Sequence, residues 1–344
     1  MHSDLSSTLA RSAPRPPASR SKALANDRVV AHHLRGSSLN RALDVVGDWW
    51  TQRILRECFL GVHNFEGFQR RLGIPRQTLA LRLRALVGHD LLSTARGGYR
   101  LTERGLALYP WALLIWRWTR TWSDGAMTGH PPVLVHRDCG HAMTPVFACG
   151  KCGEAVTVRD VEYRDAPGAR MVPPLPAGVT TRWAGGRFVK GPVEGGRHSA
   201  FVTADRWTHL IISAVFLGCR SFERIEREMG IAPNILAQRL ALLVAGGFLD
   251  KRKSAEDARR FIYALTERGR DVFPLTIALV QWADRWLPIP GGPPMRRIHR
   301  SCGSALRAVV VCSHCAAALK PQRVSFQSAP GTPAADAMPS RRPR

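Results

Sequence analysis

Six of the eight cysteines in this 344-residue chain fall into two groups that share one pattern, His-x2-Cys-x9-Cys-x2-Cys. Thiolates and imidazoles spaced as two such knuckles are the ligands that tetrahedral Zn²⁺ prefers. We expect each group to bind one Zn²⁺, and because four protein ligands leave no open position, the two sites should be structural. The alternative is a set of reduced cysteines kept by descent. The expected ligands are His136, Cys139, Cys149 and Cys152 in one group, and His299, Cys302, Cys312 and Cys315 in the other.

The two groups end two copies of one sequence. Residues 48–92 align without a gap with 205–249, and after a seven-residue length difference the match resumes at Tyr99 and Tyr263. Positions that this alignment pairs are called twins below. The duplication also selects ligands, because the four ligand positions of one group all have ligand twins, whereas two further histidines do not. His141 is paired with Ser304, and His314 with Lys151, so neither histidine is expected to bind the metal.

The composition favours a polyanionic partner. The chain carries 50 Lys and Arg against 26 Asp and Glu, a formal net charge of +24, and 45% of its residues are hydrophobic. Such a balance favours nucleic acid before a membrane, although an Arg-rich solvated surface would give the same count. No apolar run approaches a membrane span. We recognise no secretory signal at the start, and the cysteines have metal spacing, which together favour the reducing cytoplasm.

The order of elements in each copy indicates a DNA-binding fold. In the first copy, residues 41–59 are apolar at helical spacing, and Asn64 is expected to cap a short helix that ends at Gly73. The next helix should bury Leu79, Leu83 and Leu86, and two strands should flank Arg96-Gly97-Gly98. Thr102 should then cap a helix that contains Trp118 and Trp122. This order is typical of a winged helix-turn-helix, a mainly α, α+β fold in which the second helix enters the major groove.

The sequence resembles the HxlR-type family of bacterial winged-helix regulators. The resembling residues are Asp44-Val-Val-Gly47, Trp50-Thr51, Ile54-Leu55, Gly61, Phe65, Gly73-Ile74, Leu79, Arg82-Leu83, Leu86, Leu91-Leu92, Tyr99-x-Leu101-Thr102, Gly105 and Trp118. The resemblance covers both copies. It implies a cytoplasmic DNA-binding regulator, and because such proteins usually act as homodimers, this chain resembles a covalent pair.

The chain also departs from the family pattern. Phe201 and Ala204 stand where the first copy has Asp44 and Gly47, and the capping serine expected after Gly-Ile is replaced in both copies. Its replacements are Pro75 and Ala232, so both recognition helices should begin with weaker capping. No cysteine precedes Asp44, which weakens an oxidant-sensor interpretation. Cys58 and Cys219 are not twins, and we expect both to be buried structural thiols.

These observations predict the following domain order. A disordered basic tail (1–36) precedes a first winged-helix domain (37–128) and a first zinc-ribbon-like unit (129–163). A linker (164–198) leads to a second winged-helix domain (199–290), a second zinc unit (291–326) and a disordered tail (327–344).

Polar residues on the second helix and on the wing are the candidates for DNA contact. Asn and Gln side chains suit adenine, Arg suits guanine, and basic wing residues suit phosphates. Arg82 and Arg239 are twins, so their shared role is either a phosphate contact or an intradomain salt bridge. The full set is Arg76, Gln77, Thr78, Arg82, Arg96, Arg100, Asn234, Gln238, Arg239, Lys251, Arg252 and Lys253.

The sequence therefore predicts a transcriptional regulator that binds double-stranded DNA sequence-specifically, as an intrachain pseudo-dimer on an imperfect palindrome or as a homodimer. The tryptophan-bearing helices 103–124 and 267–287 should pack against each other within one chain. A non-specific, nucleoid-associated protein is the alternative. We expect no enzymatic activity, since no Ser/His/Asp arrangement, phosphate loop or paired carboxylate is recognisable. A small-molecule effector, if there is one, is not identified by the sequence.

Overall fold

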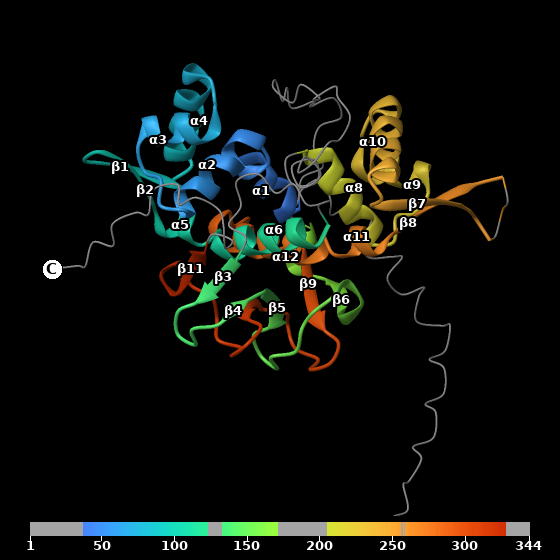
Figure 1. Cartoon of the computed structure of the whole chain (residues 1–344). Coiled ribbons are helices and arrows are strands. Elements are labelled where there is room, and N and C mark those ends of the chain that lie inside the picture. The colour runs from blue at the N-terminus through green and yellow to red at the C-terminus, as the bar shows by residue number, and fades with distance from the viewer. Residues whose placement is uncertain (1–36, 123–132, 171–204, 256, 258, 328–344) are drawn as a thin grey trace, which may run out of the picture.

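The computed structural model describes residues 37–122, 133–170, 205–255, 257 and 259–327. Two helical units stand beside each other, helices α6 and α12 lie beneath both, and a small unit built of strands lies on the far side of those helices (Figure 1). The expected tail 1–36, most of the linker and residues 328–344 lie outside the described residues, as do Phe201 and Ala204. Within the described residues, no helix combines the length and apolar composition that crossing a membrane requires.

The first helical unit has the expected order of helices and hairpin. Its elements are α1 (Ser38–Val46), α2 (Trp49–Phe59), α3 (Phe65–Leu72), α4 (Arg76–Gly88), β1 (Leu92–Ala95) and β2 (Gly98–Leu101). The apolar stretch 41–59 is broken at Gly47-Asp48, where Asp48 accepts hydrogen bonds from the amides of Trp50 and Thr51 and so caps α2. A Cβ at Gly47 would lie 2.4 Å from the carbonyl oxygen of Leu43, so the break requires glycine.

The helix-turn-helix forms from the local signals that the sequence carries. Asn64 caps α3 by accepting a hydrogen bond from the amide of Gly67, and Gly73 ends the helix with a left-handed φ of 61°. Leu79, Leu83 and Leu86 of α4 are buried. Neither α4 nor its counterpart α10 has a side-chain hydrogen bond at its N-cap in the described structure, which confirms the weaker capping expected at the Pro75 and Ala232 positions.

The second helical unit repeats this order with a longer wing. Its elements are α8 (Arg206–Phe216), α9 (Phe222–Met229), α10 (Pro233–Ala245), β7 (Leu249–Lys253) and β8 (Phe261–Leu265). The strands of this wing pair over five residues, against four in the first wing.

Two helices follow each wing, where the sequence predicts a single helix. They are α5 (Glu103–Leu106) and α6 (Tyr109–Trp122) in the first copy, and α11 (Glu267–Arg270) and α12 (Phe273–Trp286) in the second. Thr102 caps only the short α5, by accepting from the amide of Gly105. A Cβ at Gly105 would lie 2.2 Å from the carbonyl oxygen of Leu91, so α5 lies directly against the chain that enters the wing.

The tryptophan-bearing helices pack against each other within the chain, as expected. The indole of Trp118 donates to the carbonyl oxygen of Arg268 at 3.4 Å, and the indole of Trp282 donates to that of Arg104 at 3.0 Å. The two tryptophans are twins, and so are the two arginines. Contacts that exchange twins in this way are the mark of a twofold relation, here within a single chain.

The strands of the far unit pair almost entirely between copies. They are β3 (Val133–His136), β4 (Ala142–Met143), β5 (Pro145–Cys149) and β6 (Val161–Asp165) from the first copy, and β9 (Met295–His299), β10 (Ala308–Cys312) and β11 (Val324–Gln327) from the second. Strand β5 pairs with β10, β3 with β11, and β6 with β9, all antiparallel. The sequence predicts two separate zinc units, whereas the structure has one interleaved unit. The first residue of the expected linker, Arg164, lies within strand β6.

Candidate nucleic-acid interface and metal clusters

The expected recognition helices α4 and α10 both present polar side chains near their N-termini. Arg76 and Gln77 are exposed and Thr78 is partly exposed on α4, while Asn234 and Gln238 are exposed on α10. The N-cap residue of neither helix makes a side-chain hydrogen bond, so the backbone amides of the first turn are left uncapped by it. The polar faces expected from the sequence are therefore present and accessible in both copies.

Sequence reasoning missed one residue of this face. Leu81 lies one turn after Gln77 on α4 and is 56% exposed, unusual for a large apolar side chain. Its twin is Gln238, just as the twin of Gln77 is Asn234. The alignment of the copies therefore carried the signal. An exposed Leu at a position where the other copy has a base-reading candidate is suited to apolar contact with a thymine methyl group.

Arg82 and Arg239 form the salt bridges that were one of their two expected roles. Nη2 of Arg82 lies 2.9 Å from Oδ2 of Asp48, and Nε of Arg239 lies 2.9 Å from Oδ2 of Asp205. Both aspartates also cap the helix that follows them, α2 and α8. Each pair therefore ties a recognition helix to the start of the helix behind it. This duplicated ion pair positions the interface, and it is the intradomain salt bridge expected as one of the two roles of both arginines.

The second pair has the more deeply buried arginine, whereas its aspartate is the more exposed, 24% for Asp205 against 13% for Asp48. The Arg239 side chain is 9% exposed, against 24% for Arg82. Burial raises the pKa of the Asp205 carboxyl, an effect that the positive charge of Arg239 opposes. Burial likewise lowers the pKa of Arg239. Both shifts are expected of charges that lose hydration and keep each other ionised by their proximity.

The wings carry the expected basic side chains at their surface. Arg96 and Arg100 are exposed on the first wing. On the second, Lys251, Arg252 and Lys253 are exposed, and Lys251 lies 4.4 Å from the centre of the Phe261 ring. Five basic residues on two projecting hairpins are suited to contact a phosphate backbone.

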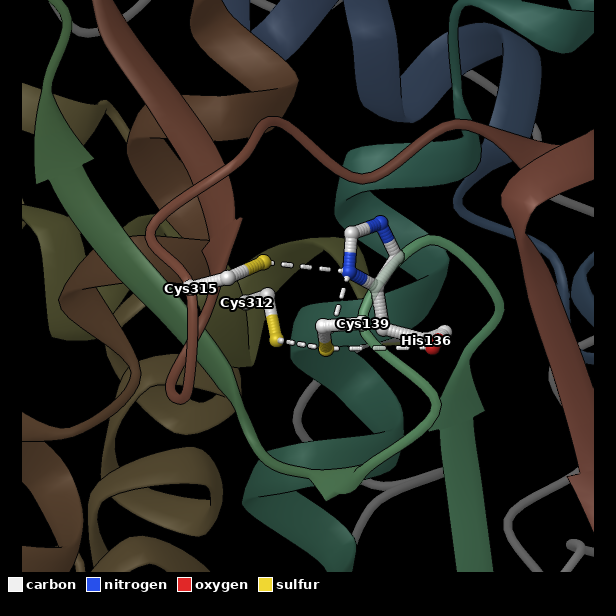
Figure 2. Close-up of side chains that lie close together, drawn as sticks. All are labelled: His136, Cys139, Cys312 and Cys315. Atoms are coloured by element: carbon white, nitrogen blue, oxygen red, sulfur yellow. Dashed lines mark hydrogen bonds between the residues drawn. The ribbon is translucent and has the colours of Figure 1, made fainter.

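The expected metal ligands do come together, but in a different grouping. His136 and Cys139 of the first copy meet Cys312 and Cys315 of the second, and we call these four residues the first composite cluster (Figure 2). Nδ1 of His136 lies 3.2 Å from Sγ of Cys315 and 3.5 Å from Sγ of Cys139, and the sulfurs of Cys139 and Cys312 are 3.9 Å apart. The expectation that each copy closes its own site was wrong.

The second composite cluster has the converse make-up, Cys149 and Cys152 with His299 and Cys302. Nδ1 of His299 lies 3.4 Å from Sγ of Cys152 and 3.4 Å from Sγ of Cys302. The sulfurs of Cys149 and Cys302 are 4.0 Å apart. The amide of Ser304 and the imidazole of His299 lower the pKa of Cys302 to about 6. Each cluster therefore offers four ligands that could hold a metal ion.

Strand geometry explains the exchange of knuckles. The nine residues between Cys139 and Cys149 include all of the extended strand β5 except its last residue, Cys149 itself, and at about 3.3 Å per residue this strand carries the second knuckle well away from the first. Strand β5 pairs antiparallel with β10, with Phe147 opposite Val310, and these two residues are twins. The twofold relation therefore passes between them, and each cysteine knuckle ends beside the histidine knuckle of the other copy.

The two remaining cysteines lie apart from these clusters. Cys219 is buried, as expected, while Cys58 is partly exposed at the residue level. Burial of its thiol nevertheless raises the pKa of Cys58 to about 12. The environment of Cys58 therefore does not favour a reactive thiolate at neutral pH.

Comparison with known proteins gives matches to one family. The model of the HxlR-like helix-turn-helix family matches residues 45–127 and again 202–289. Uncharacterised HTH-type transcriptional regulators of Mycobacterium bovis and Mycobacterium tuberculosis are each 37% identical over 130 residues, which are 38% of this chain and 82% of theirs. Those relatives are thus about 160 residues long, less than half of this chain. The HTH-type regulator YvaP of Bacillus subtilis is 26% identical over 87 residues, 25% of this chain and 81% of its own.

Two solved structures also match. One is a proposed transcription factor of Pseudomonas aeruginosa, 26% identical, covering 37% of this chain and 86% of its own with a TM-score of 0.30. The other, the proposed transcription factor PA1607, is also 26% identical and covers 41% of this chain and 96% of its own with a TM-score of 0.35.

The duplicated ion pair generates a stability prediction. Replacing Arg239 by Met leaves the Asp205 carboxylate without its partner in a buried place, which should cost about 3–5 kcal/mol of unfolding free energy. The matched Arg82→Met variant should be destabilised for the same reason, because the Asp48 carboxylate that it leaves without a partner is only 13% exposed. Urea unfolding followed by circular dichroism measures both. Unchanged stability in either variant would contradict the assigned role.

Proposed function

The chain belongs to the HxlR-like helix-turn-helix family, and on that premise we propose that it regulates transcription by binding double-stranded DNA sequence-specifically through both winged helices of one molecule. The observation that carries this proposal is the twofold exchange of contacts between α6 and α12. It gives one chain the arrangement of two half-site readers that a dimer otherwise supplies. The cytoplasm is the compartment in which such a regulator meets DNA.

The placement of the recognition helices supports this mode of binding. In Figure 1, α4 and α10 both lie on the side of α6 and α12 that faces away from the strand-built unit. Two readers on one side of a rigid core can address successive turns of one duplex face. The wings extend outward beside them, where their basic residues would reach the flanking phosphates.

The residues on the two helices favour an imperfect palindrome. Gln77 and its twin Asn234 are both suited to adenine, which would give the half-sites a common position. Leu81 and its twin Gln238 differ in kind, since one is suited to a thymine methyl group and the other to a base edge with hydrogen-bonding groups. Together with the unequal wings, these differences would make the two half-sites similar but not identical.

We also propose that each composite cluster holds one structural Zn²⁺. A tetrahedral site with Zn–S of about 2.3 Å and Zn–N of about 2.0–2.1 Å has S···S edges of about 3.8 Å and N···S edges of about 3.6 Å. The clusters have S···S distances of 3.9 and 4.0 Å, and N···S distances of 3.2 to 3.5 Å. With one histidine and three cysteines, each set is closed, and the metal would join the two copies.

The first prediction of this proposal tests sequence-specific recognition. Arg76→Ala with Gln77→Ala should weaken binding to the specific site by roughly 1–3 kcal/mol for each base-reading side chain that is truncated, with little effect on random DNA. Lys251→Ala, Arg252→Ala and Lys253→Ala together should instead weaken binding to all sequences and flatten the dependence on salt. Fluorescence anisotropy at several salt concentrations, on an operator selected from random sequences, measures both.

Arg159→Ala is the matched control, because Arg159 is exposed in the strand-built unit, away from α4 and α10. If no sequence is selected above random DNA, the non-specific alternative that the net charge of +24 favours is correct. If the wing variant binds random DNA as well as the wild type does, the wings do not contact the backbone.

The second prediction tests how the zinc ligands are grouped. Cys139→Ser with Cys149→Ser removes one ligand from each composite cluster, so dialysed protein should lose both zinc ions. Cys139→Ser with Cys312→Ser removes two ligands from one cluster, so one zinc ion should remain. Elemental analysis of protein purified under reducing conditions gives the count. Clusters closed within each copy would give the opposite result, and wild-type protein without zinc would rule out a structural zinc role.

The third prediction tests the pseudo-dimer. Because α6 and α12 already pack against each other within the chain, their surfaces are not available for a second molecule. One chain should therefore occupy the minimal operator, and light scattering of the complex should give the mass of one chain plus one duplex. Two chains on the minimal site would mean that each winged helix pairs with its counterpart in another molecule.

A further inference from the structure

We propose a third metal-binding site, at the edge of the first composite cluster, in which His141 and His314 bind a divalent transition-metal cation together with the thiolate of Cys139. The ligand atoms of these three residues all lie within 4.8 Å of one another. The site goes beyond the two structural zinc ions, and its sharing of Cys139 rests on the zinc assignment made above.

The two imidazoles come from different copies and lie face to face. Their ring centres are 3.5 Å apart and their planes differ by 11°. Both residues are exposed, so stacking in water buries little apolar surface and gives little reason for two histidines to meet there. Imidazole is the commonest side-chain ligand of transition metals, and a bound ion would lie in the plane of each ring, so the two exposed rings would turn out of this stack to bind one ion.

The protonation of His141 suits it to metal binding. Its Nδ1 lies 2.5 Å from the carbonyl oxygen of Cys139. A carbonyl oxygen only accepts, so Nδ1 is the donor of this hydrogen bond, and Nε2 is the ring nitrogen that a metal ion would use. Histidine ligands in proteins are commonly oriented in this way by a hydrogen bond from the other ring nitrogen to a backbone carbonyl.

The second composite cluster lacks such a pair, although the fold places the twin residues together there. Ser304 is the twin of His141 and Lys151 is the twin of His314. Nζ of Lys151 donates to Oγ of Ser304 at 2.7 Å. An ammonium group has no lone pair and repels a cation. Equivalent positions of the fold therefore carry two histidines beside the first composite cluster, and a lysine hydrogen-bonded to a serine beside the second.

The proposed site differs from the structural sites in its chemistry. Two imidazoles and one thiolate are borderline ligands, suited to Zn²⁺, Co²⁺ or Ni²⁺ rather than to Mg²⁺ or Ca²⁺. Cys139 would bridge two metal ions, and three protein ligands leave at least one position for water. With two of its three ligands exposed, the ion should exchange with solvent more readily than the two enclosed ions.

The test is a titration of the untagged, full-length protein, as purified, with Zn²⁺ and separately with Co²⁺. The wild type should bind one ion beyond those it retains on purification. His141→Ser with His314→Lys gives each position its twin's residue and should abolish that extra ion. Lys151→His with Ser304→His, the converse exchange, should create one more. Isothermal titration calorimetry and the visible spectrum of bound Co²⁺ count the ions.

The comparison between variants decides the result. Other histidines in the chain, such as the adjacent His32 and His33, can bind metal weakly, so the difference between variants is the relevant quantity. If the wild type and the His141→Ser, His314→Lys variant take up the same number of added ions, the proposal is wrong. Failure of the structural zinc assignment would show separately, as protein that contains no zinc when purified. Circular dichroism confirms that each variant is folded.

Discussion

The antiparallel pairing of β5 with β10 is the constraint on which the lower half of the molecule depends. Because Phe147 and Val310 are twins and lie opposite each other, the strand pair exchanges the ends of the two copies. Every metal-ligand knuckle then meets its complement from the other copy. A single copy would hold only half of each cluster and would need a second copy to complete it, so neither cluster can form before both copies have folded together.

The same twofold relation holds in the upper half, where it is carried by packing. The reciprocal indole contacts of Trp118 and Trp282 fix α6 against α12, and the duplicated aspartate–arginine pairs fix α4 and α10 to their own domains. The recognition helices are thus connected to one another, because an ion pair fixes each helix to its own domain and the packing of α6 against α12 joins the two domains. Preorganisation of this kind reduces the entropic cost of docking both helices on DNA.

The fold could be predicted from the sequence because the signals for its helices and turns are local. The grouping of the metal ligands could not, because it depends on which strands, distant in the sequence, pair with each other. The cap at Asn64, the turn at Gly73 and the apolar spacing of α4 are read within a few residues. Spacing likewise identified the metal-ligand candidates, but it cannot say which strand pairs with which, so their grouping was wrong. The salt bridge of Arg82 was open to prediction, because Asp48 is duplicated along with it. The proximity of His141 and His314 could not be predicted from the alignment of the copies, because the twofold relation places these two non-twin positions beside each other.

Fusion of the two copies explains why such differences persist. In a homodimer a substitution appears in both halves, so Lys151 and His314 could not differ and both clusters would have the same edge. In one chain each copy varies independently, provided that the contacts which exchange twins are kept. The exchanged tryptophan contacts that hold the copies together are duplicated, whereas other contacts between the copies occur once, such as the ion pair of Arg117 with Asp271. Divergence therefore extends to the seam between the copies as well as to the wings and the outer faces of α4 and α10, and the duplicated tryptophan contacts hold the pair together while each copy acquires a specificity of its own.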